Sequence, residues 1–256
     1  VNFKISEQLK LTQTKILIPK PNTLKQLVTY VPKEQAEILR NALYEAGAGK
    51  IGNYDSCSFS VVGNGHFRPI EGANPFIGDE GKLATVEEER IEVIVPQQFE
   101  SSIMNALFSH HPYEEVAYSV IPLINSNKTV GIGMIGELAT EMDEMEVFNY
   151  LKAQMNTPVI RHSKLLNKKI KKVAVLGGSG AFGIKNALAA GADIYITADL
   201  KYHDFFTAEN KLVLADIGHF ESEQFTKNLI TSYLKEKFTN FVVFNSGINT
   251  NPVNYC

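Results

Sequence analysis

A histidine and a glutamate four residues apart form the pair in this chain that is best suited to metal chemistry. His219 and Glu223 follow the apolar run Leu212–Leu214 and open a helical pattern. If the residues from Phe220 onward are helical, both side chains lie on one face, one turn apart. An imidazole nitrogen and a carboxylate oxygen are two ligands of a divalent transition-metal site, which needs others from elsewhere. The same spacing also fits a polar helix start whose acidic residues complement the helix dipole.

A glycine-rich turn provides a second candidate site. Gly178, Ser179 and Gly180 follow a predicted strand over residues 172–176 and precede a helical pattern. Asp199 stands about twenty residues further on, which is the spacing of a dinucleotide-binding fingerprint. In such a turn the backbone amides bind phosphate. A dinucleotide-binding protein, a phosphate subsite for a nucleotide and simple tight packing of the turn are therefore all compatible with this segment.

Alternating strands and helices would position both candidate sites. We expect strands at residues 130–138, 159–162, 172–176, 194–197, 212–215 and 241–244, and helices at residues 144–154, 182–190, 202–208 and 222–238. Strands separated by helices indicate an α/β layer with mostly parallel connections.

The preceding part of the chain has a different order of elements. We expect strands at residues 25–31, 56–62, 65–69, 90–95 and 116–123, with helices starting near residue 32 and spanning 97–109. The second helix should bury Ile103, Leu107 and Phe108. This order is β-α-β-β-α-β with an additional hairpin, the ferredoxin-like arrangement. The polar stretch Asn125–Lys128 marks a boundary, so the predicted divisions are residues 1–22, 23–124 and 125–256.

Composition excludes several classes of partner. A net charge of −3 and a pI near 6.1 give no strong signal for nucleic acid or an acidic membrane surface. No apolar run approaches the length of a membrane span, and no signal peptide is expected from the pattern of the first residues. Only Cys57 and Cys256 are present, so a disulfide framework is not expected and a reducing cytoplasm is the expected location.

Four segments together carry a family resemblance. They are the strand and turn of residues 172–180, the stretch of residues 190–203, the Gly218-His219 segment, and the C-terminal residues 249–255. In this order they resemble the Nif-three-like dinuclear metal-centre family, many of whose members are named GTP cyclohydrolase I type 2 homologues. The resemblance covers nearly the whole chain. It implies an α/β metal-site half-domain in residues 125–256, with residues 1–22 as the end of the first α/β half and a ferredoxin-like, PII-like or CutA-like insert at 23–124.

The resemblance also implies roles for individual residues. His219 and Glu223 match metal ligands of the family, while Asp199 and His203 match a stretch that lines its metal cleft and would orient a ligand or the substrate. The implied cofactors are divalent ions (zinc, iron or manganese), two per subunit in the complete protein. They would activate a water molecule or hydroxide to attack a purine nucleotide or a related substrate. A non-enzymatic regulatory or metal-handling module is the alternative, and no catalytic residue is assigned.

Part of the family pattern has no match in this chain. Family members begin with a segment that supplies a His-His-Pro motif and an aspartate as the remaining ligands. We therefore expect this chain to start after that segment, to hold metal weakly and to be inactive alone. His110, His111 and Pro112 superficially resemble the motif, but they end a predicted helix and are expected to serve packing and turn formation. The family assembles as a toroidal homohexamer, and a smaller assembly is expected here.

Overall fold

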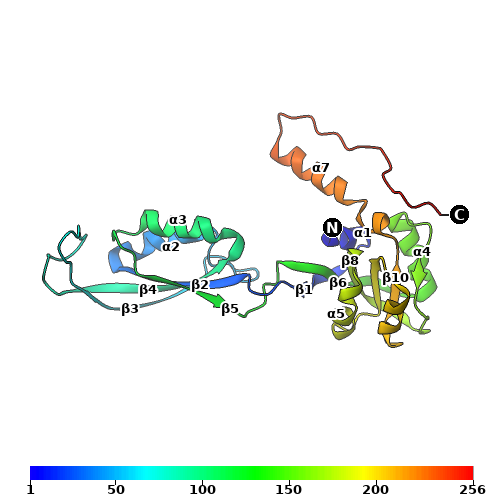
Figure 1. The fold of residues 1–256 in the computed structure, drawn as a ribbon, viewed down its shortest axis with the longest axis horizontal. Coiled ribbons are helices and arrows are strands. Elements are labelled where there is room, and N and C mark those ends of the chain that lie inside the picture. The colour runs from blue at the N-terminus through cyan, green and yellow to red at the C-terminus, as the bar shows by residue number, and fades with distance from the viewer. Residues whose placement is uncertain (256) are drawn as a thin grey trace. The chain divides into compact units, whose positions relative to one another are not determined.

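Two compact units make up the structure, a computed structural model that describes residues 1–255 (Figure 1). The α/β unit comprises Val1–Pro19 and the residues from Thr129 onward, and the insert unit comprises Lys20–Lys128. The sequence placed the insert at residues 23–124, a few residues shorter at each end.

The α/β unit is built on a six-stranded sheet in the order β1-β6-β8-β9-β10-β7. These strands are β1 (Thr12–Pro19), β6 (Gly131–Asp143), β7 (Arg161–His162), β8 (Lys169–Ser179), β9 (Ile194–Ala198) and β10 (Val213–Asp216). Only the β8-β9 and β9-β10 pairs are parallel, and β1-β6, β6-β8 and β10-β7 are antiparallel. The expectation of mostly parallel connections was therefore wrong, because antiparallel strands flank a parallel centre.

Apolar side chains bury both faces of this sheet. Along β8, Val173 and Val175 belong to one buried cluster, whereas Ala174 and Leu176 belong to the cluster on the other face. Successive residues of a strand point to opposite faces, so a strand that is apolar throughout must be covered on both sides. The helices of this unit are α1 (Asn2–Gln8), α4 (Glu144–Met155), α5 (Ile184–Ala189), α6 (His219–Glu223) and α7 (Thr226–Lys237), with 3-10 turns η3 (Ala181–Gly183) and η4 (Tyr202–Ala208).

The C-terminal part of this unit differs from the sequence prediction. The single helix expected over residues 222–238 is two helices, α6 and α7. Helix α7 buries no residue and extends away from the sheet (Figure 1). The strand expected over residues 241–244 was wrong. Although that run is apolar, a strand needs a hydrogen-bonded neighbour, and these residues have no strand partner within the described part of the chain.

The insert unit has the predicted ferredoxin-like topology. Its antiparallel sheet has the order β3-β4-β2-β5, formed by β2 (Leu24–Pro32), β3 (Ser58–Phe67), β4 (Ala84–Pro96) and β5 (Tyr118–Leu123). Helices α2 (Ala36–Glu45) and α3 (Glu100–His110), each preceded by a 3-10 turn, η1 (Lys33–Gln35) or η2 (Gln97–Phe99), contribute buried leucine and isoleucine side chains to its core cluster. Inward side chains of β2 and β4 join the same cluster, which explains the alternation that the sequence showed.

Two details of the insert prediction were wrong. The expected hairpin at residues 56–62 and 65–69 is a single strand, β3, in which Gly63 and Gly65 pair with Glu88 and Val86 of β4. Glycine here does not make a turn. A side chain at position 65 would overlap the Glu88 carboxylate, so Gly65 gives that group its space. Phe108 is 49% exposed rather than buried.

His111 has the packing role expected of it. Its ring is buried and makes a 2.9 Å hydrogen bond from Nε2 to the Tyr30 carbonyl, and Nδ1 accepts a 3.1 Å hydrogen bond from the Tyr113 amide. The ring is therefore neutral, with its proton on Nε2. Burial lowers the pKa of His111 below its usual 6.5, against smaller opposing effects of the Tyr30 hydrogen bond and the Glu88 charge.

The lowered pKa of His111 predicts a loss of stability in acid. Because the folded protein takes up this proton less readily than the unfolded chain, stability is lost as the pH falls below the unfolded pKa of 6.5. Thermal unfolding measured between about pH 7 and pH 5 should show this decrease, and His111→Gln should reduce the pH dependence. His110→Gln, at an exposed neighbouring position, should leave it intact. Equal pH dependence of wild type and His111→Gln would contradict the assignment.

Across residues 1–255, no helix is both long enough and apolar enough to cross a lipid bilayer.

Candidate metal centre

The predicted site residues gather at the carboxyl ends of the three parallel strands. Gly178 lies at the end of β8, Asp199 directly follows β9, and His219 begins α6, three residues after the end of β10. Because parallel strands end at the same edge of a sheet, the loops after them meet there, and this edge is the usual ligand crevice of open α/β sheets.

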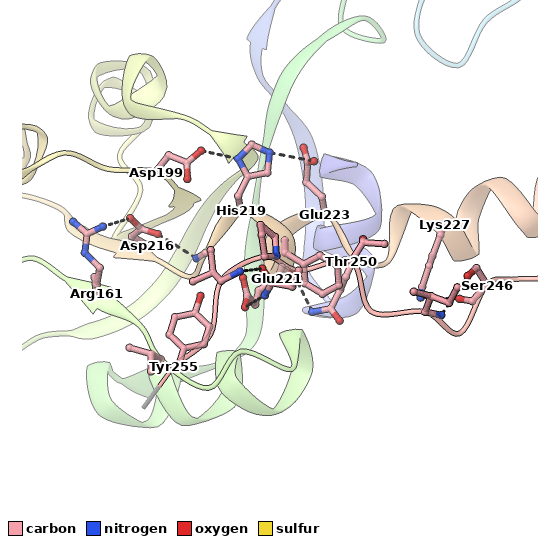
Figure 2. A pocket seen from close by; sticks show the side chains of 18 residues that line it. Arg161, Asp199, Asp216, His219, Glu221, Glu223, Lys227, Ser246, Thr250 and Tyr255 are labelled. Carbon is pink, nitrogen blue, oxygen red and sulfur yellow. Dashed lines mark hydrogen bonds and ion pairs between the residues drawn. The ribbon is translucent and has the colours of Figure 1, made fainter.

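The imidazole of His219 lies between two carboxylates (Figure 2). Nδ1 is 2.6 Å from Asp199 Oδ2, and Nε2 is 3.4 Å from Glu223 Oε2, one helical turn along α6. An ionised carboxylate only accepts hydrogen bonds, so Nδ1 carries a proton and donates a hydrogen bond to Asp199. In the neutral ring, Nε2 then presents a lone pair to the Glu223 oxygen. Two acceptors that face each other are stable only when a proton or another cation lies between them.

The ionisation of His219 reflects this arrangement. The hydrogen bond to Asp199 is the main cause that raises the pKa of His219 above its usual 6.5. Partial burial of the ring acts in the opposite direction, and the negative charges of Asp199 and Glu223 raise the pKa further. A metal ion at Nε2 would have to displace the proton that this environment attracts.

The separation of the two donor atoms fits a shared metal ion. Ligand atoms about 2.0–2.2 Å from zinc at a tetrahedral angle lie about 3.3 Å from each other. The Nε2–Oε2 distance is 3.4 Å. The proton on Nδ1 and its carboxylate acceptor complete the pattern of a metal-ligating histidine, whose second nitrogen usually donates to a carboxylate. The pair thus has donor types and a spacing that fit a zinc ion.

A required glycine keeps space beside this pair. Gly178 has φ +71°, and a methyl group at this position would lie 2.9 Å from Glu223 Oε1 and 3.4 Å from His219 Nε2. Only glycine adopts this backbone conformation freely and leaves both donor groups undisturbed.

A buried aspartate that the sequence did not reveal fixes the loops around the pair. The Asp216 side chain is 5% exposed and accepts hydrogen bonds from the Leu200 amide at 3.0 Å and the Gly218 amide at 3.1 Å. Arg161 Nη1 also donates to it at 3.1 Å. Asp216 therefore ties the loop after β9, which carries Asp199, to the loop that carries His219. The sequence signal for Asp216 was its position directly after an apolar run that forms a buried strand.

A pocket of about 750 Å³ opens beside the pair. Arg161, Asp199, His219 and Glu223 contribute polar groups to its lining, and Val159, Ile248, Val253 and Tyr255 contribute apolar surface (Figure 2). His203, expected to orient a ligand, lies in η4, where its ring packs 5.2 Å from the Tyr202 ring and does not line this pocket. The structure thus brings together His219, Glu223 and Asp199, but not His203.

The glycine-rich turn does not offer its amides to a phosphate. The Gly178 amide donates to Ser222 Oγ at 2.8 Å, and the Gly180 amide donates to the Ala198 carbonyl at 3.4 Å. A side chain at position 180 would overlap Thr197 Oγ1, so this glycine allows close packing on β9. Asp199, the acidic residue of the fingerprint, is bonded to His219 instead. The amides of Gly178 and Gly180 are therefore hydrogen-bonded within the protein rather than free to bind a phosphate.

This pair supplies fewer ligands than a metal site usually contains. Within residues 1–255, no group of three or more histidine, cysteine, aspartate or glutamate side chains is placed to hold one metal ion. Zinc sites generally have at least three protein ligands. His219 and Glu223 would thus leave further coordination positions to water or to ligands from elsewhere.

Comparison with known proteins places these features in a family. The model of the Duf34/NIF3 (NGG1p interacting factor 3) family matches residues 1–252. Proteins named GTP cyclohydrolase 1 type 2 homolog from Bacillus subtilis (strain 168) and Halalkalibacterium halodurans are each 38% identical, over all of this chain and 70% of their own length. The crystal structure of a Bacillus cereus protein related to NIF3 superimposes with a TM-score of 0.83 at 37% identity, covering all of this chain and 69% of that one.

Proposed function

Because this chain belongs to the Duf34/NIF3 family, we propose that it binds a divalent metal ion through His219 and Glu223 and serves metal-dependent hydrolysis of a purine nucleotide or a related molecule. The observation that carries this proposal is the 3.4 Å separation of His219 Nε2 from a Glu223 oxygen, while Nδ1 lies 2.6 Å from Asp199 Oδ2. The relatives named after GTP cyclohydrolase support the substrate class.

In this proposal some residues bind the metal ion and others orient the residues that bind it. His219 and Glu223 hold the ion, and Asp199 fixes the tautomer and the angle of the imidazole. Asp216 holds the loops that carry Asp199 and His219 at a constant separation. A bound divalent ion would supply an activated water molecule and stabilise negative charge on the substrate. The pocket beside the ion would receive the organic part of that substrate.

A metal-handling role without turnover is the second candidate. The two-ligand donor set favours it, because two protein ligands hold a metal ion more loosely than the three or four of typical zinc sites. Incubation with GTP and zinc or manganese, followed by chromatography of the products, separates the candidates. Metal-dependent loss of GTP supports the hydrolase. Metal binding with unchanged GTP is the result expected if this chain is inactive alone, and it leaves metal handling as the role that the chain performs by itself.

Asp199→Asn tests the proposed metal site. Asparagine keeps the size of the side chain but lets the imidazole adopt the other tautomer, so zinc affinity should fall by about 10- to 100-fold. Asp204→Asn is the control, because Asp204 caps η4 through the Lys201 amide and does not touch His219. Zinc titration followed by calorimetry measures both variants. Equal affinity of Asp199→Asn and wild type would count against the proposed arrangement.

A further inference from the structure

The C-terminal segment forms one wall of the pocket beside His219 and Glu223. Ile248, Val253 and Tyr255 all line it, although residues 245–255 contain no regular secondary structure. At its start the segment is tied to α7: Lys227 Nζ donates to the Ser246 carbonyl at 3.2 Å, and Asn245 Nδ2 donates to Asn228 Oδ1 at 2.5 Å. Side chains, rather than strand pairing, hold this wall in place.

Its far end is held by a second carboxylate of α6. Glu221 lies between the two proposed metal ligands in sequence but is 4% exposed, and its Oε1 accepts a 3.1 Å hydrogen bond from Asn251 Nδ2. The Tyr255 hydroxyl lies near the same carboxylate: partial burial, and then the charge of Glu221, raise the pKa of Tyr255 above its usual 10.0. Glu221 therefore contacts the C-terminal segment, whereas Glu223 contacts His219.

Gly218 shows how closely these groups approach. It has φ +91°, and a methyl group there would lie 3.0 Å from the Tyr255 hydroxyl and would overlap Glu221 Oε2. The carboxylate and the phenol thus pack directly against the α-carbon that precedes His219. This contact places the wall of the pocket next to the first residue of the proposed metal pair.

From these contacts we propose that Glu221 is a positioning residue, which holds residues 249–255 as a wall of the pocket through Asn251 and Tyr255. This inference rests on the proposed function in one respect, namely that the pocket binds a substrate. The two glutamates of α6 then have different roles: Glu223 would bind the metal ion, and Glu221 would hold the segment that forms the pocket wall. In this contact the Asn251 amide is the donor and the Glu221 carboxylate is the acceptor, and two substitutions can exchange these roles.

The test exchanges the two partners. Asn251→Asp replaces the donor with a carboxylate that faces a buried carboxylate, so the segment should detach. Adding Glu221→Gln restores one donor and one acceptor in reversed positions, so the double variant should reattach it. Carboxypeptidase Y removes Cys256 and then Tyr255, and the rate of the second step, followed by mass spectrometry of the intact chain, measures detachment. We expect Asn251→Asp to accelerate release about tenfold or more, and the double variant to return near the wild-type rate.

Two controls make the result decisive. Tyr255→Phe removes one hydroxyl at an exposed position and should produce a smaller acceleration, measured at residue 255 in the same way. Zinc affinity should stay close to wild type in Asn251→Asp, since Asn251 hydrogen-bonds Glu221 and neither of the proposed metal ligands. Release at the wild-type rate in Asn251→Asp, or fast release in the double variant, would overturn the role of Glu221. A zinc affinity that is unaffected by loss of His219 would instead overturn the proposed function and leave this result standing.

Discussion

His219→Ala is expected to lower zinc affinity by more than about tenfold, since loss of a metal ligand should exceed the effect of losing a group that only orients it. Glu223→Ala should have a comparable effect, because the two side chains supply the two donor atoms. His203→Ala is the matched control: it removes an imidazole from η4, whose ring packs on Tyr202. Zinc titration by calorimetry on the three variants gives the comparison.

Reduced zinc affinity in His203→Ala but not in His219→Ala would move the site to η4. Wild-type zinc affinity in all three variants would refute metal binding by this part of the molecule. Thermal melting of each variant separates a lost ligand from a lost fold. The His219 and Glu223 side chains are 54% and 41% exposed, so their removal should change the melting temperature little.

Gly178→Ala should damage both stability and metal binding. The alanine must adopt a positive φ, which costs about 1–2 kcal/mol. Its methyl group would also lie 2.9 Å from Glu223 Oε1 and displace that carboxylate from His219. We expect a zinc affinity reduced about tenfold or more, because a ligand must move away from its partner. Chemical denaturation and zinc titration provide the two measurements.

Gly191→Ala separates the two effects of that substitution. Gly191 has φ +69°, close to the +71° of Gly178, but the nearest atom to an added methyl group is the flexible end of Lys172 at 3.8 Å. The backbone cost should therefore be similar, while zinc affinity should stay unchanged. If both variants lose zinc affinity equally, general destabilisation would explain the loss, and the specific contact with Glu223 would be contradicted.

Local patterns predicted the parts of the site that lie within one helix or one loop. The four-residue spacing of His219 and Glu223 sufficed to place them together, because a helix brings such residues onto one face. The contact between Asp199 and His219 joins loops 20 residues apart and depends on the parallel pairing of β9 with β10. The family resemblance placed Asp199 near the metal, whereas spacing alone had offered it only as the acidic residue of a dinucleotide-binding fingerprint.

Features that depend on a distant partner were missed. Asp216 acquires its role from the distant Leu200 amide and from Arg161, which reaches it because β7 pairs antiparallel with β10. Gly63 and Asn64 looked like a turn between two strands, yet they pair within one strand because β4 supplies a continuous neighbour. The apolar run of residues 241–244 has strand composition, but pairing requires an available edge, which composition does not reveal.

Anomalous diffraction at the zinc edge, from crystals of the chain grown with zinc, tests the central claim most directly. The account predicts an anomalous peak between His219 and Glu223, with Nε2 and a Glu223 oxygen each about 2.0–2.2 Å from the ion and Nδ1 still bonded to Asp199. A peak on other side chains, with His219 still in direct contact with Glu223, would contradict it.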